Sequence, residues 1–131
     1  MKPFLPTLSL ALLTALCGCS KLSPEAKEIV GVYYNPEVSQ NEPVMELNPN
    51  ATCLIRAIKP GVLSFDVKGT WNVENDSLIM LLDSSTLHFT GDSTLIGNIP
   101  ERIARKVAEH NEFSLQLEQN DVSYIFHRRT E

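Results

Sequence analysis

The sequence lacks the residue patterns that metal sites and nucleic-acid sites require. Its 131 residues include only 3 Cys and 3 His. The histidines, at positions 88, 110 and 127, are too scattered to give a C-x-x-C or H-x-x-x-H spacing. Eleven Lys and Arg stand against 16 Asp and Glu, for a net charge of −5, so the basic surface that releases counterions from phosphates is missing. We therefore expect no metal, no other cofactor and no nucleic-acid partner.

Catalytic groupings are equally sparse. Ser84 and Ser85 lie near His88, and Asp83 lies near Asp92. Neither grouping occurs in a nucleophile elbow or in a metal-ligand pattern, the arrangements that activate such side chains. We therefore expect no enzyme activity.

The longest apolar run lies at the amino terminus and has the composition of a leader. Lys2 precedes the run LSLALLTAL at residues 8–16, as in a secretory signal peptide. The run is too short to span a bilayer, which takes about 20 apolar residues.

The four residues that end this leader carry a more specific signal. The sequence Leu16-Cys17-Gly18-Cys19 resembles the lipobox of bacterial lipoproteins, with an aliphatic residue at −3, a small one at −1 and cysteine at +1. The resemblance implies cleavage after Gly18 and acylation of Cys19, and several acyl chains anchor a protein durably. Ser20 resembles the residue that follows the cysteine in lipoproteins sent to the outer membrane. The alternative is an ordinary secretory signal cut before a free cysteine.

These observations predict three segments. Residues 1–18 form the signal peptide, residues 19–28 form a short polar tether that can end in a helical turn, and residues 29–131 form a single β-rich domain. In the processed chain Cys53 has no internal disulfide partner. It lies in the apolar run ATCLIRAI, so burial as a small hydrophobic residue is favoured over an intermolecular bond.

Alternation of apolar and polar residues dominates the chain after residue 28. Between Ser64 and Glu74 the apolar side chains share one face and the polar ones the other, which predicts a long antiparallel strand with one wet face. Similar segments recur at short spacing with turn residues between them. The fold class expected is all-β, a small antiparallel barrel or sandwich of about eight strands. The large inward side chains expected are Phe65, Val67, Trp71, Met80, Leu87, Phe89, Leu115 and Phe126.

One segment departs from the alternation. In residues 100–111 the apolar residues Ile103, Ala104, Val107 and Ala108 recur at helical spacing, with Pro100 in front. This favours one short helix near 100–110. The alternative is an extended connection between two strands.

The order of short strand, L-N-P-N-A-T turn, strand and K-G-T-W over residues 29–90 resembles the early meander of small lipocalin-like lipoprotein domains. That resemblance implies that Trp71 packs into the floor of a barrel. Residue type alone gives the same expectation of burial for a lone inward tryptophan.

Two functions stay open at this stage. Five basic residues in two short segments would form a patch for anionic lipid head groups or an envelope protein partner if they lie together: Arg102, Arg105, Lys106, Arg128 and Arg129. The chain would then be a structural or interaction module of the cell envelope, anchored in the outer membrane at Cys19. The alternative is a lipocalin-like carrier of a small apolar ligand. Large inward side chains in a chain of this length favour the first function, because they are expected to fill the interior of an eight-stranded barrel.

Overall fold

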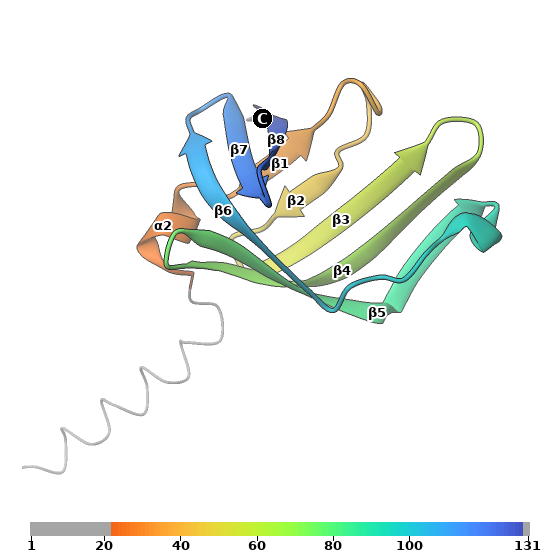
Figure 1. The fold of residues 1–131 in the computed structure, drawn as a ribbon, viewed down its shortest axis with the longest axis horizontal. Coiled ribbons are helices and arrows are strands. Elements are labelled where there is room, and N and C mark those ends of the chain that lie inside the picture. The colour runs from red at the N-terminus through yellow and green to blue at the C-terminus, as the bar shows by residue number, and fades with distance from the viewer. Residues whose placement is uncertain (1–21, 130–131) are drawn as a thin grey trace, which may run out of the picture.

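The computed structural model describes residues 22–129, and these form a closed antiparallel β-barrel (Figure 1). The eight strands follow one another around the barrel in chain order, and β8 pairs with β1. The expected all-β class is confirmed, and the choice between barrel and sandwich is settled in favour of the barrel. The strands are β1 Gly31–Tyr34, β2 Met45–Leu47, β3 Thr52–Lys59, β4 Leu63–Glu74, β5 Ser77–Gly91, β6 Arg102–His110, β7 Ser114–Gln119 and β8 Val122–Arg129.

Two tight hairpins show how local sequence sets the register. Asn75 and Asp76 join β4 to β5, and Asn120 and Asp121 join β7 to β8. All four have positive φ angles, between 52° and 66°. Two-residue turns of this kind match the twist of antiparallel strands, and Asn and Asp tolerate the left-handed region better than most residues.

A short helix, α2 (Pro24–Lys27), closes one end of the barrel. Ser23 caps it by accepting a hydrogen bond from the backbone of Ala26, and its hydroxyl donates to the carbonyl of Val73 on β4. Leu22 and Ala26 are buried. The helical turn expected at the end of the tether is present, but residues 22–28 pack on the barrel instead of forming a free tether.

The end of the barrel next to α2 is called the floor below. Apolar side chains from several strands fill it. Trp71 is 3% exposed and donates from Nε1 to the carbonyl of Asn48 at 2.9 Å, which confirms the expected burial. Cys53 is buried as well, and its burial is likewise confirmed. Other side chains that fill this half of the barrel are Ile29, Tyr33, Leu47, Val73, Leu78, Leu115 and Leu117.

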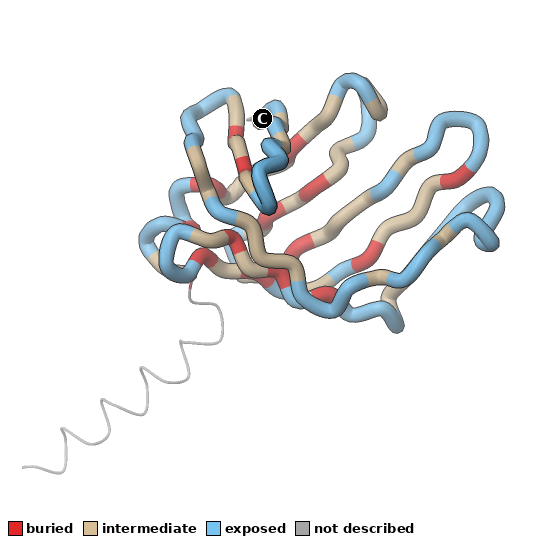
Figure 2. The backbone as a smooth tube through the Cα atoms, viewed as in Figure 1, coloured by how far each residue is buried: buried red, intermediate tan, exposed pale blue. Residues whose placement is uncertain are grey.

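The opposite end of the barrel is open because its strands differ in length. β4 pairs with β5 as far as Leu63 and Gly91, whereas β6 pairs with β5 only between Ser77 and Leu81. The ends of β3, β4 and β5 therefore extend beyond their neighbours as a three-stranded sheet (Figure 1). Figure 2 shows buried segments concentrated toward the α2 end and exposed backbone at the hairpin tips.

The prediction of a helix near 100–110 is wrong, because this segment is strand β6. Its backbone pairs with β5 on one side and β7 on the other. The register places Ile103 beside Met80 and Arg105 beside Leu78, both buried, so alternate residues face inward. The helical pattern depended on Ala104 and Ala108, and alanine is small enough to fit either face of a strand.

Phe89 lies on the same face as Phe65, as the sequence pattern predicts, but it is not buried. It is 45% exposed, because it lies on the part of β5 that extends beyond β6. The other seven expected inward side chains are buried or packed against the core.

Candidate functional site: an apolar cavity at the open end

The open end of the barrel contains a cavity of about 350 Å³. Its lining comes from the loop after β1 and from strands β2, β3, β5, β6 and β8, and most of it is apolar. The main apolar side chains are Val44, Met45, Ile55, Met80, Ile103 and Phe126. Inward side chains therefore fill the floor of the barrel but leave space at the open end, which is called the mouth below. This corrects the expectation of a filled interior.

The cavity follows from the change in side-chain size and strand pairing along the barrel. Near α2, Trp71 and Tyr33 cross the interior and are at most 3% exposed. Toward the mouth, β3 continues into Ala57, a small residue on the cavity lining. Among residues 22–129, β6 pairs with β5 only as far as Leu81, so no strand continues the barrel wall beside β5 beyond that point.

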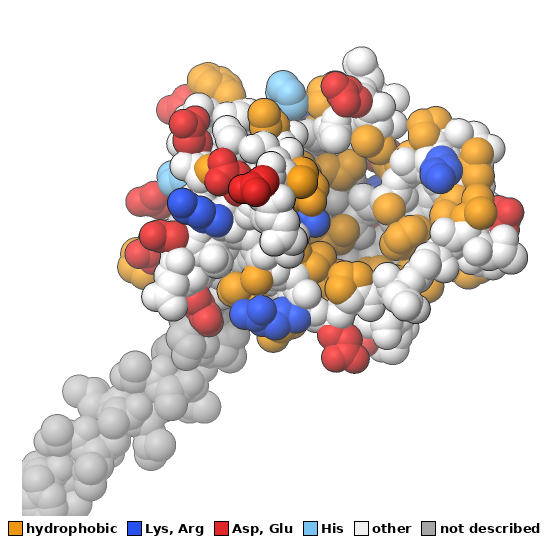
Figure 3. Space-filling model, viewed as in Figure 1, with side chains coloured by type: hydrophobic (Ala, Val, Ile, Leu, Met, Phe, Trp, Pro, Cys, Tyr) orange, Lys and Arg blue, Asp and Glu red, His pale blue; other side chains and the backbone are white. Residues whose placement is uncertain are grey.

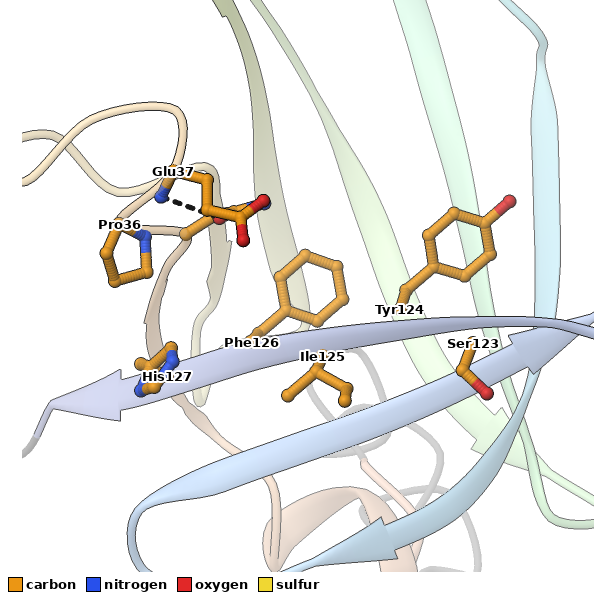
Figure 4. A pocket seen from close by; sticks show the side chains of 8 residues that line it. Pro36, Glu37, Ser123, Tyr124, Ile125, Phe126 and His127 are labelled. Carbon is orange, nitrogen blue, oxygen red and sulfur yellow. Dashed lines mark hydrogen bonds between the residues drawn. The ribbon is translucent and has the colours of Figure 1, made fainter.

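Four polar residues, Asn35, Arg56, Arg105 and Tyr124, also line the cavity. The carbon at the centre of the Arg105 guanidinium lies 3.9 Å from the centroid of the Tyr124 ring. Arg105 Nε donates to Gln119 Oε1 at 3.2 Å. Figure 4 shows Tyr124 and Phe126 pointing to the same side of β8, whereas Ser123 and Ile125 point to the other. Arg105 and Tyr124 therefore place polar groups within an apolar wall.

Arg56, which borders the same cavity, is already engaged elsewhere. Its Nη1 donates to the carbonyl of Pro43 at 2.6 Å and lies 3.8 Å from Glu46 Oε2. It therefore closes the β1–β2 loop against β3 and offers less to a ligand than Arg105 does.

The inner face of the extended sheet continues the apolar surface outward. Ala57 pairs with Phe65 across β3 and β4, and Phe65 pairs with Phe89 across β4 and β5. Figure 3 shows hydrophobic side chains around a hollow between the barrel body and the extended sheet. A ligand longer than the cavity would meet this face as it left the mouth.

A second groove, of about 640 Å³, lies along β8 and is the one drawn in Figure 4. Residues 122–126 pair with β7, but β1 reaches only as far as the Tyr34–His127 pair. Beyond that pair the chain turns away through Pro36 and Glu37, which form the opposite wall. Among the described residues, no strand covers this edge of β8.

The structure does not bring the five predicted patch residues onto one surface. Arg102 and Lys106 are exposed on the outer face of β6, whereas Arg105 points into the barrel. Arg128 donates to the carbonyls of Asn111 and Val30 at 3.0 and 2.7 Å, and the Arg129 guanidinium lies 3.7 Å from the Tyr34 ring centroid. These two residues tie β8 to its neighbours near the floor. Cys19, the predicted lipidation site, lies outside the described residues.

In the two groupings considered for catalysis, Asp83 lies within β5 and Asp92 caps the short 3₁₀ turn Ser93–Leu95. Asp83 Oδ1 accepts hydrogen bonds from the backbone and hydroxyl of Ser85, and these bonds lower the pKa of the Asp83 carboxyl. Asp92 is held in the same way by Thr94, with the same effect on its pKa. Within residues 22–129 no cluster of three or more His, Cys, Asp or Glu could hold a metal ion, and no helix is long and apolar enough to cross a membrane.

Sequence reasoning placed Arg105 in a surface patch and did not identify the cavity. The signal that could have identified its orientation is the alternation of Ile103, Arg105 and Val107, which the helical interpretation obscured. A search of protein-family models, of curated proteins and of solved structures found no match to this chain.

Proposed function

We propose that this protein binds a small, mainly apolar ligand in the open end of its barrel. The observation that carries the proposal is the cavity of about 350 Å³, which lies between a filled floor and an open mouth. Small-molecule sites are concave, largely apolar spaces of about 300–1,000 Å³ with a few placed polar groups. The role is one of binding, without chemistry on the ligand.

The apolar lining supplies the driving force for binding. Removing apolar surface from water contributes about 25 cal/mol per Å². Partly exposed side chains such as Ile103 and Phe126 present that surface to the cavity. Because much of the wall is formed by strands held in the barrel by backbone pairing, the site is largely formed before a ligand enters, which limits the entropy lost on binding.

We also propose that Cys19 carries a lipid that anchors the protein in the bacterial outer membrane. Two residues separate Cys19 from Leu22, which packs at the floor end of the barrel. An extended chain spans at most about 3.6 Å per residue, so the floor would lie near the bilayer and the mouth would point away from it. The support for the anchor is the lipobox-like sequence.

Labelled palmitate tests the anchor directly. It should enter the wild-type protein and should be lost from Cys19→Ser. Incorporation that persists in Cys19→Ser and disappears in Cys17→Ser would assign the lipid to the other cysteine.

Ligand binding is tested with the purified protein and a neutral, environment-sensitive dye such as Nile red. We expect the dye to show saturable fluorescence enhancement with the wild-type protein. The affinity of Ala57→Trp for the dye should be at least tenfold lower, because the indole occupies the mouth. Lys106→Trp, on the outer face of β6, is the matched control and should bind like wild type. Native mass spectrometry of the untreated protein should show a retained small molecule. Equal dye affinity in all three proteins would show that the cavity is not the binding site.

The free edge of β8 favours a second candidate function, that of an envelope interaction module. An extended segment of a partner protein could add to this edge as a further strand, since unpaired strand edges recruit chains through backbone hydrogen bonds. A photo-crosslinking amino acid at position 125 should then link to an extended segment of one partner, whereas the same group at position 106 should not. Equal labelling at both positions would reject this function.

A further inference from the structure

We propose that Arg105 and Tyr124 form a subsite for an anionic end group, so that the ligand is a single-chain amphiphile with a terminal carboxylate or phosphate. This inference rests on the proposed function, because it assigns chemistry to one wall of the same cavity. It starts from the position of Arg105. The pairs Met80–Ile103 and Leu78–Arg105 put this side chain on the inward face of β6.

Arg105 is half-buried, and its hydrogen bond to Gln119 is exposed to solvent, so its guanidinium is accessible to a ligand that enters the open end. The three ion pairs among residues 22–129 do not include Arg105. Its contacts in that range are the Tyr124 ring and the neutral side chain of Gln119. These contacts hold the guanidinium in place but leave its positive charge without an anionic partner.

The neighbouring acidic groups are placed so that they do not neutralise Arg105. Glu118 lies opposite Lys106 in the pairing of β6 with β7, and both alternate with the residues that face inward. Glu118 therefore faces the outside of the barrel. Glu46 lies beside Arg56. Glu37 lines the groove along β8 and forms no ion pair with Arg105 in the described structure. An incoming anion would therefore be the first to pair with this guanidinium.

The geometry suits an anion at the end of an apolar chain. The Nε bond to Gln119 fixes one edge of the guanidinium, and no hydrogen bond from either terminal nitrogen occurs within residues 22–129. Those nitrogens match two oxygens of a carboxylate or phosphate. The Tyr124 hydroxyl, on the same side of β8 as Phe126 (Figure 4), is a further donor. Apolar side chains such as Ile103 and Phe126 would contact the chain that follows the anion.

Calorimetric titration with three dodecyl compounds below their aggregation concentrations tests the subsite. The compounds are dodecanoate, dodecyl phosphate and the uncharged 1-dodecanol. Hydrogen bonds to charged groups contribute about 1.5–3 kcal/mol, so we expect at least one anion to bind roughly 10- to 100-fold more tightly than the alcohol. The tighter of the two anions identifies the end group.

Variants of β6 and β8 separate the charge effect from general damage. Arg105→Gln should abolish the preference for the anion while leaving the affinity for dodecanol within about twofold of wild type. Arg105→Lys should retain part of the preference, and Tyr124→Phe should reduce it. Arg102→Gln, which removes a charge from the outer face of β6, should change nothing. Circular dichroism and thermal unfolding establish that each variant is folded.

The two proposals fail in different ways. Equal affinity for dodecanol and both anions, unchanged in Arg105→Gln, would overturn the anionic subsite while leaving the cavity as an apolar binding site. Two results together would overturn the proposed function itself. None of the three compounds would bind, and Ala57→Trp would bind the dye with the same affinity as wild type.

Discussion

At the scale of single residues, Trp71 shows how one side chain stabilises the floor. It is 3% exposed, and its indole N–H reaches the carbonyl of Asn48 in the β2–β3 turn. The residue thus combines a large apolar contact area with a satisfied hydrogen bond, as buried tryptophans usually do. The interaction ties a turn to the core that it covers.

We predict that Trp71→Ala lowers the free energy of unfolding by about 3–5 kcal/mol, the range for deletion of a buried aromatic side chain. Trp71→Phe should cost less, because it keeps most of the apolar volume. Urea unfolding followed by far-ultraviolet circular dichroism measures both. In the wild type, Trp71 emission should resist quenching by iodide, and free access of iodide to the indole would place Trp71 outside the core.

Burial also sets the chemistry of two ionisable groups near the floor. Desolvation raises the pKa of the Cys53 thiol from 9.0 to about 11. It raises the pKa of Tyr33 from 10.0 to about 12, against an opposing effect of Arg128. Both groups are therefore neutral in the folded protein over a wider pH range than in the unfolded chain.

This difference predicts a loss of stability at alkaline pH. Between about pH 9 and 11 the unfolded chain releases protons from Cys53 and Tyr33 that the folded protein retains, so the free energy of unfolding falls as pH rises. One pKa unit corresponds to about 1.4 kcal/mol, and we expect Cys53 to account for about 1–2 kcal/mol of the loss. Urea unfolding at pH 8 and pH 11 should show a smaller fall for Cys53→Ala than for wild type. Parallel falls in the two proteins would argue against a raised thiol pKa.

At the scale of secondary-structure elements, the close approach of β4 and β5 depends on Gly69. The residue pairs with Leu82, and a Cβ at this position would collide with the backbone carbonyl of Leu81. Glycine is thus required by neighbouring backbone here, and the φ angle of Gly69 is not positive. The pairing continues on both sides of the residue, so this contact fixes the two longest strands relative to each other.

We predict that Gly69→Ala destabilises the protein by about 3 kcal/mol, because the collision is with backbone and overpacking of this kind is not relieved by a rotamer change. Gly97→Ala is the matched control, since nothing lies within 4 Å of a Cβ added there. Thermal unfolding of the two variants should give a large decrease in Tm for the first and little change for the second. Similar Tm values for both would show that β4 and β5 separate readily at this point.

At the scale of the whole molecule, strand length decides which end of the barrel is open. The floor end is covered by α2 together with Leu22 and Ser23. The mouth lies where β3, β4 and β5 extend beyond their neighbours. Phe65 and Phe89 pair on the inner face of this extension. A bound chain that fills the cavity would therefore continue onto an apolar surface instead of entering water.

We predict that affinity for amphiphiles increases with chain length beyond the length that fills the cavity, by up to about 0.8 kcal/mol for each methylene that becomes buried. Phe89→Ser should reduce the gain for long chains and leave short chains unaffected, because Phe89 does not line the cavity. Titration with saturated carboxylates of increasing length measures the effect. A gain that stops at the same chain length in both proteins would exclude the extension from binding.

The sequence by itself determined the all-β class, the approximate number of strands, the presence of turns between them and the burial of Trp71 and Cys53. These features follow from local alternation, turn chemistry and residue type. Tertiary structure decided that residues 102–110 form a strand, because pairing with β5 and β7 outweighs a helical pattern that relied on two alanines. It also decided the cavity, because space at the mouth depends on which strands end first. Arg105 faces that cavity through its register with Leu78, and a register between distant strands is not encoded in either strand alone.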